Sequence, residues 1–166
     1  YSIMKIGLVH GRFQPFHNGH KFLVDEMLKE CDLGIVLIGS AIKNDEKNIF
    51  DMETRKQMIR DIFGENKKLL IGANIDLDSP HAEDAQWDVV FSSCVLSLTG
   101  YLPTHVYTGD NYSVHWERVK PEFRKFKRYD EISATDVRKL LSEKNFDEVK
   151  KLVPEHVFEI IQAGQK

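Results

Sequence analysis

The chain has 166 residues, of which 42% are hydrophobic and 30% are charged, and its net charge at pH 7 is -3. This composition is typical of a globular protein with a real core, and it excludes fibrous, low-complexity and strongly basic chains. The longest aliphatic runs, such as Ile35–Ile38, are far shorter than the roughly 20 residues that cross a bilayer. We therefore expect neither a nucleic-acid partner nor a membrane partner.

The N-terminus and the two cysteines point to a cytoplasmic protein. Residues 1–3, ahead of Met4, are expected to be a cloning remnant with no role in the fold, and no basic-then-apolar signal segment is present. Cys31 and Cys94 stand outside any CxxC or Cys/His cluster, so they do not make a zinc site. We expect both to be reduced, buried small hydrophobes.

The first half of the chain alternates predicted strands and helices. Residues 4–10 and 33–38 are short apolar runs typical of buried strands, and residues 68–77 form a third strand. Apolar residues at helical spacing predict helices over residues 18–30 and 51–63. Each of the first two predicted strands is therefore followed by a predicted helix.

The second half continues the alternation. Residues 85–98 form a predicted helix, and residues 104–108 and 125–129 form the fourth and fifth strands. Helices follow over residues 134–143 and over residues 155–166, the second with a periodic part that ends at residue 163.

This pattern predicts an α/β fold for the whole chain. Strands that alternate with helices of about 10–15 residues form a parallel sheet covered by helices on both faces. We expect a doubly wound, Rossmann-like sheet in a single domain over residues 1–166. Such sheets bind ligands at the carboxyl ends of their strands, so the chemistry should follow the first, second and fourth strands.

A phosphate-binding pattern follows the first predicted strand. Residues 10–20 are His-Gly-Arg-Phe-Gln-Pro-Phe-His-Asn-Gly-His. Asn18 is a good N-cap type, and a helix N-terminus suits an anion. His17 and His20 are three residues apart, so they share one helix face. With Arg12, the two imidazoles would form a cluster of donors for a phosphate.

The plain alternative is that these histidines only cap a helix or fill a core. A zinc site is a second alternative, but two histidines without a third ligand are insufficient. The position of the motif, where the fold predicts a ligand, favours the phosphate hypothesis. No role is assigned to His10, and the basic run over residues 118–128 is typical of a solvated face.

A second candidate anion site opens the helix at residue 134. Ser133 and Thr135 are N-cap types immediately before an apolar-periodic stretch. Arg138 follows Thr135 by three residues, so its guanidinium shares a face with that hydroxyl and could hold two phosphate oxygens. Taken alone, the same pattern also fits a plain N-cap beside a surface arginine.

Both motifs resemble one family. Residues 11–20 resemble the signature of the HxGH nucleotidyltransferase superfamily, and residues 132–138 match its Ile-Ser-x-Thr-x-x-Arg motif. The wording Arg-Phe-Gln-Pro-Phe-His-Asn-Gly-His is similar to that of archaeal-type nicotinamide-nucleotide adenylyltransferases. It is also similar to the adenylyltransferase half of bifunctional bacterial enzymes with a Nudix domain. The likeness runs from residue 4 to about residue 161, and the chain shows no Nudix pattern.

The resemblance implies an enzyme that joins the AMP moiety of ATP to nicotinamide mononucleotide, which gives NAD and pyrophosphate. It implies that His17, His20 and Arg138 are catalytic. It also implies Mg²⁺ carried by the ATP phosphates rather than by protein ligands, in keeping with the preference of this ion for few protein ligands. A homo-oligomer is expected by analogy alone.

The resemblance also assigns binding residues by shorter matches. The ATP-binding residues would be Gly11, Arg12, Phe13, Arg55, Gly109, Asp110, Ser133 and Thr135. The acceptor-binding residues would be Gly39, Ser40 and Trp87. The Trp87 ring would stack on the pyridinium of the acceptor, whereas the alternative is a core tryptophan on an amphipathic helix.

Other functions of the same superfamily stay open at this point. The acceptor could be amidated or deamidated mononucleotide. The chain could instead transfer AMP or CMP to phosphopantetheine, a flavin or an alcohol phosphate. A non-catalytic nucleotide sensor is the alternative from a different functional class. A class I aminoacyl-tRNA synthetase is excluded, because the chain has no KMSKS-like loop and no room for tRNA recognition.

Overall fold

The computed structural model describes residues 4–39, 48–73, 84–109, 120–127 and 132–164, except for the side chains of residues 84–91. Its strands are β1 (Ile6–Gly11), β2 (Leu33–Ile38), β3 (Leu69–Ala73), β4 (His105–Gly109) and β5 (Glu122–Phe126). Its helices are α1 (Asn18–Glu30), α2 (Met52–Phe63), α3 (Asp84–Thr99), α4 (Ala134–Ser142), α5 (Phe146–Leu152) and α6 (Glu155–Ala163).

The strands form one parallel sheet in the order β3-β2-β1-β4-β5. The chain therefore builds outward from the central β1, first on one side and then on the other. The direction changes between β1 and β4, and ligands of such sheets bind at the carboxyl ends of the strands beside this switch point. A ligand-binding site is therefore expected in the segments that follow β1 and β4.

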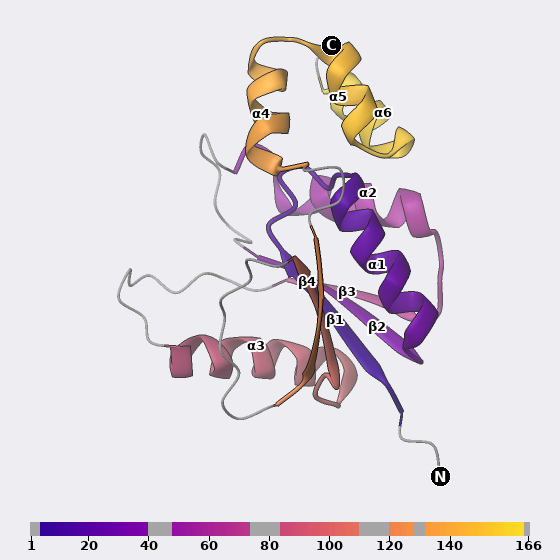
Figure 1. Cartoon of the computed structure of the whole chain (residues 1–166), viewed down its shortest axis with the longest axis vertical. Coiled ribbons are helices and arrows are strands. Elements are labelled where there is room, and N and C mark those ends of the chain that lie inside the picture. The colour runs from indigo at the N-terminus through magenta and orange to yellow at the C-terminus, as the bar shows by residue number, and fades with distance from the viewer. Residues whose placement is uncertain (1–3, 40–47, 74–83, 110–119, 128–131, 165–166) are drawn as a thin grey trace.

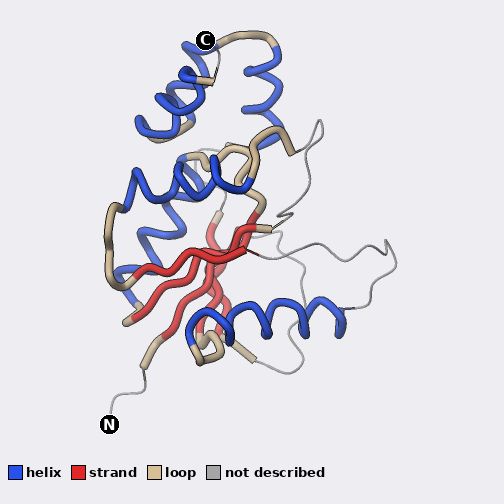
Figure 2. Tube along the Cα trace, turned by 180° about the vertical axis from the view of Figure 1, so that it is seen from behind, coloured by secondary structure: helices blue, strands red, loops and turns tan. Residues whose placement is uncertain are grey.

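Helices cover both faces of the sheet (Figures 1 and 2). Helices α1 and α2 lie on one face and α3 lies on the other, while α4, α5 and α6 lie beyond the carboxyl ends of the strands. Neighbouring residues of β1 point to opposite faces, as the pleat of a strand requires. Val9 belongs to the larger core with α1, α2 and the C-terminal helices, whereas Leu8 belongs to the smaller core with α3.

This architecture confirms the predicted doubly wound α/β fold and most of the predicted elements. β5 is an exception, because it spans Glu122–Phe126 rather than the predicted residues 125–129, of which 128 and 129 lie outside the described residues. The parallel pairing decides its position: His105 of β4 pairs with Glu122, and Gly109 pairs with Phe126. The prediction also missed α5, a helix of seven residues. Of the predicted third strand, residues 74–77 lie outside the described residues.

In the part of the chain that the structure describes, no helix is both long enough and apolar enough to span a membrane. Cys31 and Cys94 are free thiols; the first is buried as expected, and the second is only half-buried.

Candidate active site

His17 caps the N-terminus of α1. Its Nδ1 accepts hydrogen bonds from the backbone N–H groups of Gly19 (3.0 Å) and His20 (3.4 Å). In return, the backbone N–H of His17 donates to Nδ1 of His20 (3.2 Å), which completes a capping box. The predicted cap, Asn18, is therefore wrong. The Asn18 amide donates instead to the carbonyl oxygen of Lys151 (3.2 Å) and ties α1 to α5.

This cap determines which ring nitrogens carry the protons. Because Nδ1 accepts hydrogen bonds in both His17 and His20, the proton of each neutral imidazole lies on Nε2. The rings stack with their centroids 3.7 Å apart and an angle of 21° between their planes. Two parallel imidazoles therefore present the same kind of donor, an Nε2–H, from the start of one helix.

Aromatic side chains surround the His20 ring. The Phe13 ring meets it edge-on with the centroids 4.8 Å apart, and the Phe16 ring lies 5.5 Å away. Desolvation holds the pKa of His20 well below its ordinary value, and the electrostatic effect of the neighbouring His17 ring lowers this pKa further. His20 is therefore a neutral donor at pH 7, although part of the residue reaches the surface.

Phe13 has a left-handed backbone with a φ of 56°, which is rare for a residue other than glycine. Its side chain is buried beside Phe16 and His20. The packing of this ring compensates for the backbone strain, and strain of this kind clusters at functional sites. Because the ring is buried, only the main chain of Phe13 could make the predicted contact with ATP. That contact stays a prediction.

Helix α4 brings the second motif to the same loop. Ser133 caps α4 as predicted, since its side chain accepts a hydrogen bond from the backbone N–H of Asp136 (3.2 Å). Arg138 donates from Nη2 to Oγ1 of Thr135 (3.3 Å), as their spacing predicts. Arg138 also donates from Nη1 to the carbonyl oxygen of Gln14 (2.9 Å). The structure therefore joins the two motifs directly, across 124 residues of sequence.

Arg12 adds a second guanidinium beside Arg138. Burial lowers the pKa of Arg138, and the nearby positive charge of Arg12 lowers it further. Within the described residues, neither guanidinium forms an ion pair with a carboxylate. We call Arg12, His17, His20 and Arg138 the cationic cluster. Its two guanidinium charges and its two imidazole donors lie near the starts of two helices, which is an arrangement that favours an anion.

Arg55, which the resemblance predicts to contact ATP phosphates, has a fully buried side chain. Its Nη1 donates to the carbonyl oxygens of Arg12 (2.9 Å) and Gly39 (2.7 Å), and its Nε donates to that of Asp51 (3.2 Å). A guanidinium held on main-chain carbonyls beneath the loop is not placed as a surface ligand for phosphate. We therefore separate Arg55 from the cationic cluster.

The other predicted residues that the structure describes lie at the ends of β1, β2 and β4. The backbone N–H of Gly39 donates to the carbonyl oxygen of Gly11 (2.8 Å), so these residues lie together at the ends of β2 and β1. Gly109 ends β4 on the far side of the switch point. Ser40, Asp110 and the basic residues Arg118 and Arg128 lie outside the described residues, as does the side chain of Trp87 in α3.

Sequence reasoning missed Gln14. Its amide is buried and forms two hydrogen bonds with the main chain of Phe50: Nε2 donates to the carbonyl oxygen (2.9 Å), and Oε1 accepts from the N–H (2.8 Å). Only the tertiary structure places residue 50 beside residue 14. A polar side chain inside the motif was the one signal available in the sequence.

A second polar cluster lies at the other end of α1. Glu30 accepts hydrogen bonds from Nε and Nη2 of Arg124 (3.1 Å each) and from the hydroxyl of Tyr107. The Tyr107 hydroxyl also contacts the thiol of Cys31 (3.4 Å), and Arg124 pairs with Glu122 (3.0 Å). We call these five residues the Glu30 cluster. The hydrogen bonds from Arg124 and then Tyr107 lower the pKa of Glu30 to about 2.

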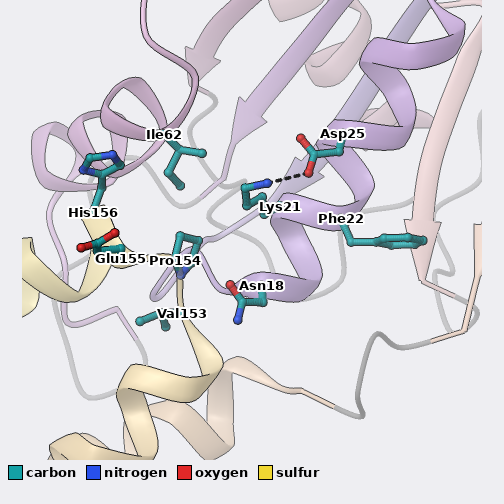
Figure 3. A pocket seen from close by; sticks show the side chains of 9 residues that line it. All are labelled: Asn18, Lys21, Phe22, Asp25, Ile62, Val153, Pro154, Glu155 and His156. Carbon is teal, nitrogen blue, oxygen red and sulfur yellow. Dashed lines mark hydrogen bonds and ion pairs between the residues drawn. The ribbon is translucent and has the colours of Figure 1, made fainter.

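A cavity of about 570 Å³ separates α1 from the start of α6 (Figure 3). Lys21 and Asp25 of α1 form an ion pair on its wall (2.7 Å between Nζ and Oδ2), and Pro154 and His156 face them. None of the predicted site residues lines this cavity. Within the described residues, no group of three or more His, Cys, Asp or Glu side chains could hold a metal ion.

Comparison with known proteins identifies the family. The cytidylyltransferase-like family model matches residues 8–140. A nicotinamide-nucleotide adenylyltransferase from Methanococcus maripaludis is 34% identical over 92% of this chain and 85% of its own length. One from Pyrobaculum neutrophilum is 33% identical over 96% of this chain and 89% of its own length. This chain belongs to the nicotinamide-nucleotide adenylyltransferases of the cytidylyltransferase-like family. The family resemblance seen in the sequence is thereby confirmed.

Solved structures support the fold of this adenylyltransferase. A bifunctional NMN adenylyltransferase/ADP ribose pyrophosphatase from Francisella tularensis, complexed with AMP and a Mn ion, superposes with a TM-score of 0.68 and 20% identity. The match covers 98% of this chain and 53% of that one. Thermotoga maritima TmcAL bound with alpha-thio ATP has a TM-score of 0.70 and 19% identity, over 96% of this chain and 55% of that one.

Proposed function

We propose that this enzyme joins the AMP moiety of ATP to nicotinamide mononucleotide, and that the cationic cluster holds the reacting phosphates. One observation carries the residue assignment. The N-termini of α1 and α4 meet at a single loop, where the imidazoles of His17 and His20 lie near two guanidiniums that repel each other. The names of the curated relatives support the choice of ATP and nicotinamide mononucleotide.

The proposed reaction needs no strong base. The phosphate of nicotinamide mononucleotide is an anion that can attack the α-phosphorus of ATP directly. A new P–O bond forms, the bond between the α-phosphorus and the bridging oxygen breaks, and pyrophosphate leaves with the electron pair of that bond. The enzyme must align two polyanions and stabilise the charge that develops on the α-phosphate and the leaving group.

The proposed roles follow from the positions of the donors. His17 and His20 donate from Nε2 to oxygens of the α- and β-phosphates. Because His20 is neutral, its donor needs no protonation step near pH 7. Arg138, with Ser133 and Thr135 at the start of α4, holds the β- and γ-phosphates. Arg12, at the surface of the loop after β1, holds the acceptor phosphate or ATP.

The remaining proposed contacts lie around the cationic cluster. Gly11, the main chain of Phe13, Gly109 and Asp110 contribute to the ATP site. Gly39, Ser40 and Trp87 contribute to the acceptor site. Mg²⁺ is carried by the triphosphate oxygens, because this ion keeps several waters and takes few protein ligands. When bound, it neutralises part of the triphosphate charge. We place the reaction in the cytoplasm, in a single domain that assembles as a homo-oligomer.

An acceptor panel tests this proposal. The purified chain is mixed with MgATP or MgCTP and with nicotinamide mononucleotide, its deamido form, phosphopantetheine, a flavin mononucleotide or an alcohol phosphate. Pyrophosphate release and product mass are measured. We expect NAD from ATP and nicotinamide mononucleotide at the highest kcat/KM of the panel. A different preferred product would reassign the acceptor. Nucleotide binding without pyrophosphate release from any pair would identify a sensor instead.

A further inference from the structure

We propose that Arg55 is a positioning residue that sets the distance between the loop after β1 and Gly39, the residue that follows β2. This inference rests on the proposed function, because that loop carries the proposed ATP ligands and Gly39 belongs to the proposed acceptor site. Arg55 touches neither substrate. It acts through the two main-chain segments that the substrates contact.

The contacts of Arg55 bridge these two segments. A single nitrogen, Nη1, donates to the carbonyl oxygen of Arg12 in the loop and to that of Gly39 at the end of β2, at 2.9 and 2.7 Å. Nε donates to the carbonyl oxygen of Asp51, the N-cap of α2, at 3.2 Å. The side chain is fully buried, so these bonds form away from water, where losing them is costly.

The topology explains why a side-chain bridge is needed there. β1 and β2 pair in parallel up to Gly11 and Ile38, and the N–H of Gly39 makes one more bond to Gly11. Beyond this point the loop after β1 turns into α1, and regular strand pairing ends. Arg55 links the two main-chain segments immediately beyond the last hydrogen-bonded pair of strand residues. The gap that it spans separates the loop of the proposed ATP ligands from Gly39 of the proposed acceptor site.

Gln14 strengthens the same connection from the other side of the loop. Its amide holds both polar groups of the Phe50 main chain, next to the N-cap of α2. The loop after β1 is therefore fixed to the start of α2 at two points, Arg12 and Gln14. Of the two side chains that make these attachments, Arg55 and Gln14, only Arg55 also contacts Gly39, which follows β2. Arg55 thus controls the relative position of the two proposed half-sites.

The geometry also explains the choice of arginine. A planar guanidinium presents several N–H donors in a fixed fork, whereas a lysine ammonium is a point charge on a flexible stem. Arg55→Lys keeps the positive charge and most of the buried volume but loses the rigid bridge. In-line transfer depends on alignment, and a displacement of about 1 Å can lower the rate about 10²-fold. The expected defect is therefore in turnover rather than in binding.

The test compares Arg55→Lys with Arg60→Lys, which changes an exposed arginine on the same helix. Dissociation constants are measured for ATP alone and for nicotinamide mononucleotide alone, and kcat is measured per titrated active site. For Arg55→Lys we expect both dissociation constants to stay within about threefold of wild type while kcat falls about 10- to 100-fold. Arg60→Lys should match wild type in all three quantities.

Two results would overturn the proposal. A tenfold or larger rise in the ATP dissociation constant with a normal kcat would make Arg55 a phosphate ligand. A normal kcat per active site with lower thermal stability would leave it a purely structural residue. If Arg55→Lys does not fold, Arg55→Ala is purified with millimolar methylguanidinium, which should restore kcat to the folded protein; no rescue counts against the proposal. Wild-type turnover in the acceptor panel tests the proposed function separately.

Discussion

The two ends of α1 differ in whether the charged side chains near them are paired with an opposite charge. At its C-terminal end, Arg124 of the Glu30 cluster is neutralised by Glu30 and Glu122 at 3.1 and 3.0 Å. At its N-terminal end, the guanidiniums of the cationic cluster lie close enough to affect each other, and no carboxylate of the described residues pairs with them. The first arrangement is complete within the chain. For the second, we propose that the phosphates of the substrates supply the compensating charge.

The helix dipole makes the contrast sharper. A carboxylate at the C-terminus of a helix and cations at its N-terminus are both unfavourable. At Glu30 the hydrogen bonds from Arg124 and Tyr107 offset this cost within the fold. In the cationic cluster the proposed offset is the charge of bound substrate phosphates. Substitutions in the cationic cluster should therefore lower activity, whereas substitutions in the Glu30 cluster should lower stability.

The largest expected effect comes from His20. Both His20→Ala and His20→Gln should lower kcat by at least about 10²-fold, because each removes an imidazole donor aimed at the transferring phosphates. Glutamine at the third helical position can keep the capping box, so His20→Gln should retain the fold. Steady-state kinetics and thermal unfolding measure the two effects.

His156→Gln is the matched control for His20, because it changes a half-exposed histidine of α6 outside the site. This control should keep wild-type turnover. A His20→Gln enzyme that turned over like His156→Gln would remove His20 from the chemistry.

A smaller effect is expected at Arg138. Arg138→Lys replaces a fork that can hold two phosphate oxygens by a point charge, and it also weakens the bond to the Gln14 carbonyl. We expect the KM for ATP to rise about tenfold, the scale of one charged hydrogen bond of about 1.5 kcal/mol. Initial rates at varied ATP measure this change, with Arg60→Lys as control. Unchanged ATP kinetics would favour the plain surface-arginine alternative.

The Glu30 cluster should respond in stability alone. Glu30→Gln removes a charged hydrogen-bond acceptor, so the free energy of unfolding should fall by about 1–2 kcal/mol at pH 7 with kcat unchanged. A depressed carboxylate pKa stabilises the fold above its ordinary value of 4.5 and loses that effect as the pH falls toward about 2. The difference between variant and wild type should therefore shrink over this range.

Urea unfolding at several pH values measures the change at Glu30. Glu53→Gln is its control, since Glu53 is an exposed residue on α2. A loss of kcat without a loss of stability in Glu30→Gln would contradict the division between the two regions.

The smallest effect concerns the protonation of His20. Its lowered pKa means that the unfolded chain takes up a proton at higher pH than the folded chain does. The free energy of unfolding should therefore fall as the pH drops below about 6.5, and His20→Gln should show a shallower fall. Proton NMR of the His20 ring should give a titration midpoint well below that of free histidine. A midpoint at or above the free value would contradict the neutral-donor assignment.

Local patterns were sufficient to predict most of the elements and the two motifs. The apolar runs of β1 and β2 and the periodic faces of α1 and α2 are properties of adjacent residues, so they are visible without the fold. The helix N-terminus at residue 133 was predicted correctly because capping is a local interaction. The cap of α1 was not, because Asn18 is the better cap by type while His17 and His20 cap reciprocally through their rings.

The sequence by itself determined the fold class, the family and the two motifs that contain His17, His20 and Arg138. Tertiary structure decided what those residues touch, since Arg138 reaches Gln14 across 124 residues and Arg55 reaches Arg12 across 43. It also decided that Arg55 is buried beneath the loop and that Glu30 is neutralised by Arg124. Hydrophobic periodicity and capping act over a few residues, whereas burial and charge pairing depend on which distant segments the sheet brings together.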